Sequence, residues 1–318
     1  MQGVLKMQYF PVTLFVSVMG ITGLSIAYQR AGHFFSLAGD VGIGLLFFAF
    51  SLFSGIGVLY LWKILHYPED ALKEFNHPVR FNFFPAISIS LLLLAIAAME
   101  HAPDLARGLW VVGAVAHLAF TVIAVSRWIN RLYSIQQFNP AWFIPVVGNI
   151  LVPIAGVEFA SKEISWFFFS VGLVFWLSLF TIMVYRLGFH DHLPEKLFPT
   201  LFILIAPPAI AFVSYFRLTG SFDPAARVLL YVAVFLTLLL FTMYRKFVKL
   251  PFFLSWWGYT FPLCAFTISL FVAFRATQLA IFNIFGGLML LIATLVVMMV
   301  AYKTIGLIRR GKLCVPEE

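Results

Sequence analysis

The chain contains ten apolar stretches, each of which is long enough to cross a bilayer as a helix. A spanning helix needs about 20 mostly apolar residues. The stretches run over 10–28, 41–65, 82–99, 107–126, 142–158, 164–185, 197–216, 226–244, 252–274 and 279–302. Hydrophobic residues make up 62% of the sequence and charged residues only 11%, so a water-soluble surface cannot be built from it. We therefore predict an all-α integral membrane protein, with a single ten-helix transmembrane domain over residues 1–318 that is surrounded by lipid.

The basic residues predict how these spans are oriented. Ten spans put both chain ends on one side, and that side carries 15 of the 21 Lys and Arg residues. The other side carries Arg30, Arg107, Lys162, Arg217, Arg227 and Arg275. Because basic loops stay in the cytoplasm, this asymmetry predicts cytoplasmic termini and a multi-pass protein of the cell (inner or plasma) membrane. The net charge of +8 then reflects membrane orientation, and no nucleic-acid partner is expected.

Prolines recur in the odd-numbered stretches, close to aromatic residues. The positions singled out as helix kinks are Pro11, Pro85, Pro145, Pro208 and Pro262. A proline inside a helix removes a backbone hydrogen bond and bends the chain. In lipid the freed carbonyl has no water to bind, so the bend has to face protein or an aqueous cavity. We predict five helical hairpins in a quasi-fivefold arrangement, with the bent helices around a central pore and the others outside.

The predicted inner helices carry hydroxyl and small residues but no acidic residue near their middle. The hydroxyls either line the passage or hold helices together. Proton-coupled transporters place Asp, Glu or His on their pathway, and cation channels often use acidic rings. A neutral pore between basic vestibules therefore favours anions. His117 lies inside an apolar stretch, where a packed neutral histidine is the preferred interpretation, but it keeps a proton-coupled transporter open as the alternative.

No pattern in the sequence predicts an enzyme, a metal site or a cofactor. The sequence contains no HExxH, GxSxG, P-loop or dinucleotide motif. His190 and His192 flank Asp191, but the three lie in a short polar connection and are interpreted as solvated loop residues. Cys264 and Cys314 form no CxxC pair. An intramembrane enzyme is therefore the least favoured class of function.

Five stretches resemble the tellurite-resistance/dicarboxylate transporter family, which includes the TehA proteins and the plant slow anion channels (SLAC). They cover 9–28, 77–95, 139–156, 206–215 and 255–262, the last of which reads SWWGYTFP. The resemblance implies ten helices in five hairpins around a central pore, and a homotrimer with one pore per subunit. It also implies conduction of small inorganic anions such as chloride and nitrate.

The same resemblance implies roles for individual residues. It places the pore-occluding phenylalanine of the family at Phe261, which directly precedes Pro262. It also implies pore-lining positions on the other inner helices, at Val16, Met19, Ile87, Val147 and Pro207. A bulky apolar ring is a sensible gate, since a hydrophobic constriction blocks ions by excluding water. The alternative function is a proton-coupled secondary transporter for dicarboxylates or tellurite-related oxyanions.

Overall fold

A computed structural model describes residues 6–315, most of which are helical, with no strand in this part of the chain. The α-helices are α1 (Phe15–Gly32), α2 (Ser36–His66), α3 (Pro68–Asn76), α4 (Ala86–Ala98), α5 (Pro103–Asn130), α6 (Ile144–Val147), α7 (Val152–Phe159), α8 (Lys162–Phe189), α9 (Ala206–Thr219), α10 (Pro224–Thr242), α11 (Tyr244–Val248), α12 (Thr260–Thr277) and α13 (Ala280–Arg309). The 3-10 helices are η1 (Met7–Tyr9), η2 (Val12–Leu14), η3 (Arg80–Phe83), η4 (Ile135–Gln137), η5 (Pro140–Phe143), η6 (Gly148–Leu151), η7 (Glu195–Ile205) and η8 (Leu254–Tyr259). The extreme termini, predicted to be cytoplasmic, lie outside the described residues.

Ten helical stretches of the described chain are long and apolar enough to cross a membrane. They are Val12–Gly32, Leu37–His66, Arg80–Ala98, Pro103–Asn130, Pro140–Phe159, Lys162–Phe189, Glu195–Thr219, Pro224–Thr242, Leu254–Thr277 and Ala280–Arg309. Each overlaps one of the ten ranges expected from the sequence. Several helices extend past the apolar run at one end or both, since a helix need not stop where the hydrocarbon does. The prediction of an all-α membrane protein is confirmed.

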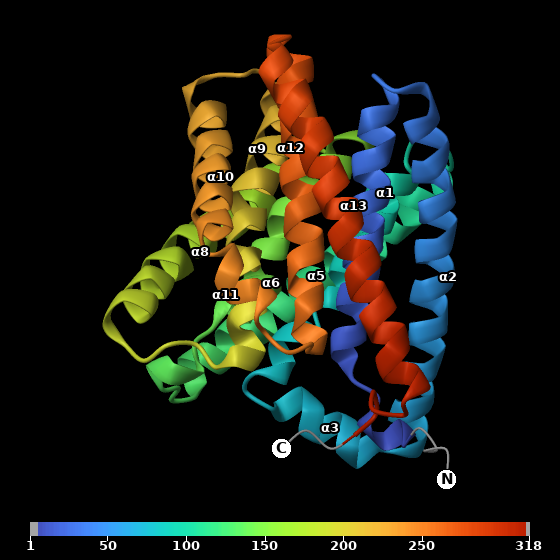
Figure 1. The fold of residues 1–318 in the computed structure, drawn as a ribbon, viewed down its shortest axis with the longest axis vertical. Helices are drawn as coiled ribbons and strands as arrows, with labels where there is room; N and C mark the ends of the chain where they lie inside the picture. Colours follow the sequence, from blue (N-terminus) through green and yellow to red (C-terminus); the bar gives the residue numbers. More distant parts are fainter. Residues whose placement is uncertain (1–5, 316–318) are drawn as a thin grey trace.

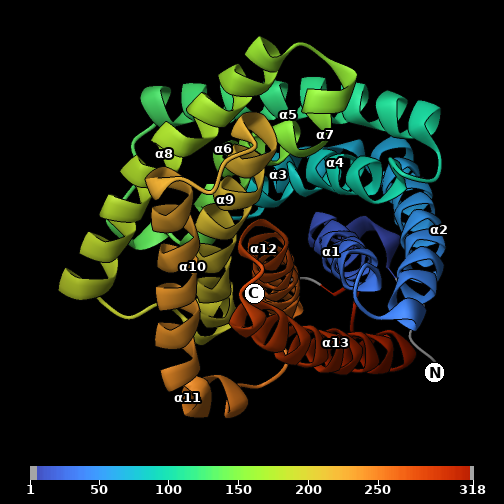
Figure 2. The same ribbon diagram turned by 90° about the horizontal axis from the view of Figure 1, so that it is seen from above.

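The odd-numbered spans form an inner ring. Between 83% and 94% of their most apolar windows is buried inside the protein, against 22% to 33% for the even-numbered spans. Helix α1 contacts both α4 and α12, α4 contacts α7, α7 contacts α9, and α9 contacts α12, so the ring closes (Figure 2). Each even-numbered span packs against the odd-numbered span before it, and the chain is therefore a series of five helical hairpins.

The described chain begins and ends at the same end of the bundle, which we name the terminal face; the opposite end is the distal face (Figure 1).

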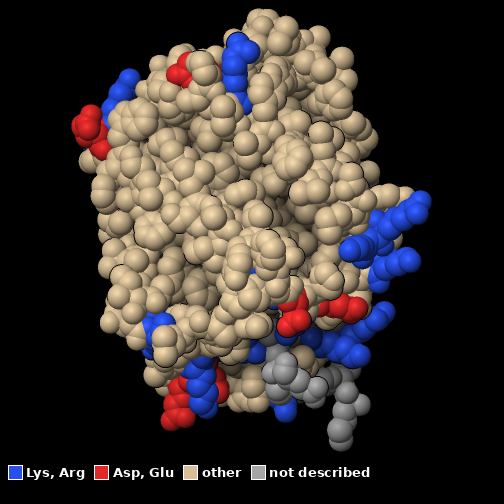
Figure 3. All heavy atoms as spheres, turned by 90° about the vertical axis from the view of Figure 1, so that its left-hand side faces the viewer, with Lys and Arg blue, Asp and Glu red and all other residues tan. Residues whose placement is uncertain are grey.

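The outer surface matches a lipid environment. Large apolar side chains such as Phe235, Leu238 and Leu295 are exposed on the even-numbered spans. In Figure 3 a broad area without charged side chains separates those near the top from those at mid-height and below. Lipid tails can cover such a surface, whereas water would disfavour it.

The prolines mark the points where the inner spans change helix type. Every inner span begins as a 3-10 helix and continues as an α-helix. Pro85 precedes α4, while Pro145, Pro208 and Pro262 lie in the first turns of α6, α9 and α12. Pro11 precedes η2 in an extended conformation. Pro145, Pro208 and Pro262 thus lie just after the change from 3-10 to α-helix in their spans, and Pro85 lies just before it.

In each inner span one polar side chain donates to the backbone carbonyl three residues before it. The donors and the carbonyls three residues before them are Ser17 to Leu14 (2.6 Å), Ser88 to Pro85 (2.8 Å), Asn149 to Val146 (2.7 Å), Thr200 to Leu197 (2.5 Å) and Thr260 to Trp257 (2.7 Å). A carbonyl left unpaired in this water-poor setting would cost free energy. These side chains therefore stabilise the irregular backbone of the inner ring.

Helix α3 lies on the terminal face and is tied to the first inner span by a buried ion pair. Lys63 Nζ on α2 lies 2.5 Å from Glu74 Oε2, and both side chains are almost fully buried. Lys63 also donates to the Phe10 carbonyl, and the other Glu74 oxygen accepts from the Val12 backbone N–H at the start of η2. The Tyr60 hydroxyl donates to Glu74 as well. This network joins α2, α3 and the entry to the inner ring.

Candidate functional site

A cavity of about 280 Å³ lies inside the inner ring. Its walls come from all five inner spans, and among them are Val16, Ile89, Val147, Pro207 and Phe261. The lining extends from residues near the terminal face, such as Lys196 and Lys312, to residues near the middle of the spans, such as Met19, Leu151 and Ile210. The cavity is therefore a blind vestibule that enters from the terminal face and stops partway through the bundle.

Four of the five lining positions expected from the sequence border this cavity. They are Val16, Met19, Val147 and Pro207. Ile87 is not among the lining residues, and Ile89 borders the cavity on that span instead. Two residues correspond to about 200° around an α-helix, so this difference in register points the side chain to nearly the opposite side. Both residues are apolar and belong to a span that is buried on all sides, so hydrophobicity alone does not separate them.

Phe261 lies in the first turn of α12 and borders the cavity. Its side chain is only 6% exposed. A side chain at Gly23 of α1 would lie 3.1 Å from Phe261 Cδ2 and equally close to Cys264 Cβ, so the absence of one allows α1 and α12 to approach closely around the ring. The interpretation of the sequence did not include Gly23. Its spacing of three residues from Gly20, which places both on one helix face, was the signal for a close helix contact.

Most of the polar residues that were candidates for lining the passage do not reach the cavity. Thr13 and Ser255 border it, but Ser17, Ser88 and Thr260 do not. The latter three donate to backbone carbonyls of their own spans. The walls are consequently apolar along most of their length, and the packing interpretation of the hydroxyl residues describes the larger part of the set.

The charged residues that border the cavity are all basic. Arg80, Lys196 and Lys312 belong to the lining, and no Asp or Glu occurs among the described lining residues. All three lie toward the terminal face: Arg80 in η3, Lys196 in η7, and Lys312 after α13. Basic side chains beside a cavity raise the local positive potential, which favours anions over cations.

The segment after α13 crosses the mouth of the vestibule. The helix ends at a left-handed Gly311, after which Lys312, Leu313 and Val315 border the cavity. Cys314 is 3% exposed, and burial raises the pKa of its thiol, a shift that the nearby Lys63 ammonium partly opposes. The sequence offered no signal for this arrangement, because the segment is short and has no repeat or periodicity.

His117 lies directly behind the cavity wall, on the outer helix α5. Ser88 Oγ lies 2.8 Å from the Pro85 carbonyl oxygen and 2.9 Å from His117 Nδ1, so a hydrogen bond joins the hydroxyl to the imidazole. His117 Nε2 has no partner among the described residues, and the ring is fully buried. This environment matches the packed neutral histidine that the sequence favoured, held by a hydroxyl and not by a carbonyl.

Gly148 separates the His117 ring from the cavity, and substituting it should be costly. A Cβ at position 148 would lie 2.4 Å from His117 Cε1 and Nε2 and 2.8 Å from Ile89 Cδ1. We expect Gly148→Ala to destabilise the protein by about 1–3 kcal/mol through overpacking. Gly57→Ala on α2, where a Cβ meets nothing within 4 Å, serves as the control. Thermal unfolding in detergent measures both; equal stability of the two variants would contradict the tight seat at Gly148.

Comparison with known proteins identifies the family once this geometry is established. A family model described as SLAC1, voltage-dependent anion channel, matches residues 9–305. The chain belongs to the SLAC1 family. The S-type anion channel SLAH3 of Arabidopsis thaliana is 30% identical over 306 residues, covering 93% of this chain and 48% of the relative.

Two prokaryotic relatives match over most of their own length. An uncharacterized transporter of Methanocaldococcus jannaschii is 26% identical, with 87% of each chain covered. A tellurite resistance protein TehA homolog of Haemophilus influenzae is 22% identical, with 87% of this chain and 85% of the relative covered. By contrast, this SLAC1-family chain spans about half the length of SLAH3 and of the related SLAH2. The family is one of anion channels and transporters, which agrees with the resemblance drawn from the sequence.

Proposed function

We propose that this chain is a gated channel for small monovalent anions such as chloride and nitrate, and that Phe261 occludes its pore. The observation that carries the proposal is the vestibule, which all five inner spans line and which the Phe261 side chain borders. Its charged lining residues are basic. The family supports anions as the transported class, and the names of the Arabidopsis relatives describe them as anion channels.

The gate works by excluding water. An apolar constriction wide enough for neither a hydrated ion nor a continuous water column stops conduction without any charged barrier. Phe261 suits this role because its ring borders a vestibule whose walls are mostly apolar, with Pro262 next to it. Rotation of the ring about its side-chain bonds, or separation of α12 from α1 at Gly23, would join the vestibule to the distal face.

The assembly and its location extend the proposal. A homotrimer with one pore per subunit follows from the family resemblance, and the apolar faces of the even-numbered spans provide surface for both lipid and subunit contacts. The excess of basic residues on the terminal face supports a cytoplasmic position for the vestibule and for both termini, in the cell membrane.

Reversal potentials of the purified protein test this proposal. In planar bilayers with a potassium chloride gradient, we expect currents to reverse at the chloride equilibrium potential, and nitrate to replace chloride as carrier. Reversal at the potassium potential would reject an anion pore. Flux of dicarboxylates or tellurite-related oxyanions that requires a proton gradient, without such currents, would favour the transporter. Gly148 separates His117 from the vestibule, so the histidine lies next to the pathway. If the protein is such a transporter, His117→Gln should abolish the dependence of flux on the proton gradient.

A further inference from the structure

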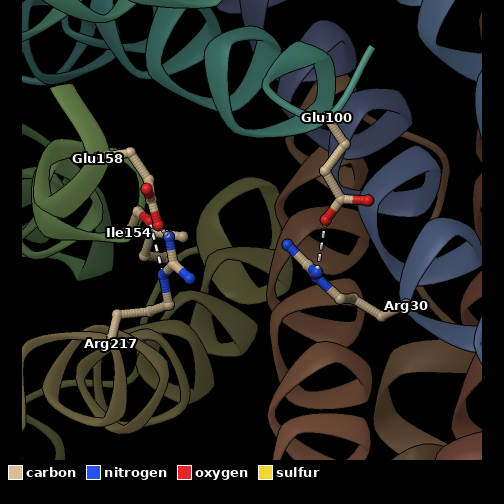
Figure 4. Close-up of polar contacts among 5 residues, drawn as sticks. All are labelled: Arg30, Glu100, Ile154, Glu158 and Arg217. Atoms are coloured by element: carbon tan, nitrogen blue, oxygen red, sulfur yellow. Dashed lines mark hydrogen bonds and ion pairs between the residues drawn. The ribbon is translucent and has the colours of Figure 1, made fainter. Parts of the chain in front are cut away.

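Each inner span carries one charged side chain at its distal end. These five residues, which we name the distal ring, are Arg30 on α1, Glu100 just after α4, Glu158 on α7, Arg217 on α9 and Arg275 on α12. Because the five spans close into a ring, their ends surround the axis on which the vestibule lies. Figure 4 shows two of the arginines with their head groups turned into the same central space.

Two of the three arginines are held by carboxylates of neighbouring spans. Arg30 Nη1 lies 3.0 Å from Glu100 Oε1, and Arg217 Nη2 lies 2.8 Å from Glu158 Oε1. Arg217 Nε also donates to the Ile154 carbonyl at 3.0 Å. The four side chains are between 21% and 56% exposed, so ions in solution can reach them. These contacts fix the two guanidinium groups on opposite sides of the central space (Figure 4).

Arg275 adds a positive charge that no carboxylate in the described chain balances. It is exposed and makes no ion pair among the described residues. Helix α12 lies between α9 and α1 in the ring, and both Arg217 and Arg275 are close enough to act electrostatically on Arg30. Three guanidinium groups and two carboxylates leave the distal ring with one excess positive charge.

We propose that the distal ring is a binding site for one small anion, centred on Arg275 and flanked by Arg30 and Arg217. A guanidinium presents a planar set of N–H donors that matches a planar oxyanion such as nitrate, and it also attracts halides. The two carboxylates lower the positive potential, so the anion is held weakly enough to leave again. The proposal rests on the proposed function, because it gives the pore a selective anion site at the end opposite the vestibule.

Equilibrium binding tests the site without requiring conduction. The unfolding temperature of the detergent-solubilised protein is measured as sodium nitrate replaces sodium gluconate at constant ionic strength, since a ligand that binds the native state stabilises it. We expect nitrate to stabilise the wild type, and the half-saturating nitrate concentration to rise about tenfold in Arg275→Gln, the loss of one charged contact. Arg227→Gln is the matched control, because Arg227 lies on the same face but stacks on Phe222 at the start of the outer helix α10.

Conductance gives a second, independent readout. With nitrate varied on the distal side only, Arg275→Gln should lower the conductance about three- to tenfold at low salt and converge with the wild type at high salt, where charges are screened. Glu100→Gln, which removes the carboxylate partner of Arg30, should raise the conductance at low salt. Identical nitrate dependence in Arg275→Gln and Arg227→Gln, by stability and by current, would overturn the site. Nitrate stabilisation that only Arg275→Gln loses, in a protein that carries no current, would support the site and reject the channel.

Discussion

Replacing Phe261 with alanine is expected to raise the chloride and nitrate conductance of the purified protein by about tenfold or more, the effect of opening a hydrophobic constriction. The substitution removes a bulky ring from the wall of the vestibule and leaves the basic residues that border it in place. Water can then fill the segment between the vestibule and the distal face, and anions follow. Single-channel recording in planar bilayers measures the change directly.

Phe271→Ala provides the matched control for this experiment. Phe271 is a buried phenylalanine of the same helix, but it packs toward the outer ring, where a Cβ at Gly286 of α13 would lie 2.9 Å from its Cε1. The control variant therefore loses the same number of atoms and a similar amount of packing without opening the axis. An equal rise in both variants would indicate general loosening of the bundle, and no rise in Phe261→Ala would exclude Phe261 as the gate.

Replacing Glu74 with glutamine is expected to cost about 3–5 kcal/mol of stability, the range for removing one partner of a buried ion pair. The Lys63 ammonium would stay buried with the Phe10 carbonyl as its remaining described acceptor. Glutamine has a single acceptor oxygen, so either the Val12 N–H or the Tyr60 hydroxyl and the Lys63 ammonium would face an amide NH2 that cannot accept. Unfolding in detergent, followed by temperature or denaturant, measures the loss.

Asp70→Asn tests whether burial is the cause. Asp70 belongs to the same helix α3 and lies 3.6 Å from Lys73 Nζ, but that lysine is 74% exposed. An exposed pair of this kind contributes less than about 1 kcal/mol. If the two variants lose the same stability, the buried network does not anchor α3 to the first inner span, and our account of this corner of the protein is wrong.

Lipid explains why so much of the architecture could be predicted from the sequence. A chain that crosses a bilayer has to satisfy its backbone hydrogen bonds internally, so each apolar stretch of sufficient length becomes a helix. The prolines in alternate stretches, Pro85 and Pro262 among them, identify spans that cannot face lipid. The structure buries all five of these spans and leaves the even-numbered ones mostly exposed. The family followed from the same motifs.

Tertiary structure decided what each inner residue contacts. Because an inner span is buried on all sides, its sequence has no polar face that reports orientation, and Ile87 could not be distinguished from Ile89. Ser88 looked like a pore-lining hydroxyl, yet it bonds the backbone of its own span and His117. The change from 3-10 to α-helix at the prolines, which creates these carbonyl contacts, leaves no mark in an apolar sequence.

The long-range polar contacts also required the fold. In the sequence, Glu74 and Lys63 resemble ordinary charges at the membrane interface. In the structure, the position of helix α3 places them in a buried ion pair. In the sequence, Arg30, Arg217 and Arg275 contributed only to the number of basic residues on one side of the membrane. They lie around one axis because the five inner spans close into a ring. The sequence by itself determined which segments enter the membrane and which of them avoid lipid, since hydrophobicity and backbone chemistry are local. Which side chains meet at the centre depends on helix rotation and packing, and these are set only when all ten spans are assembled.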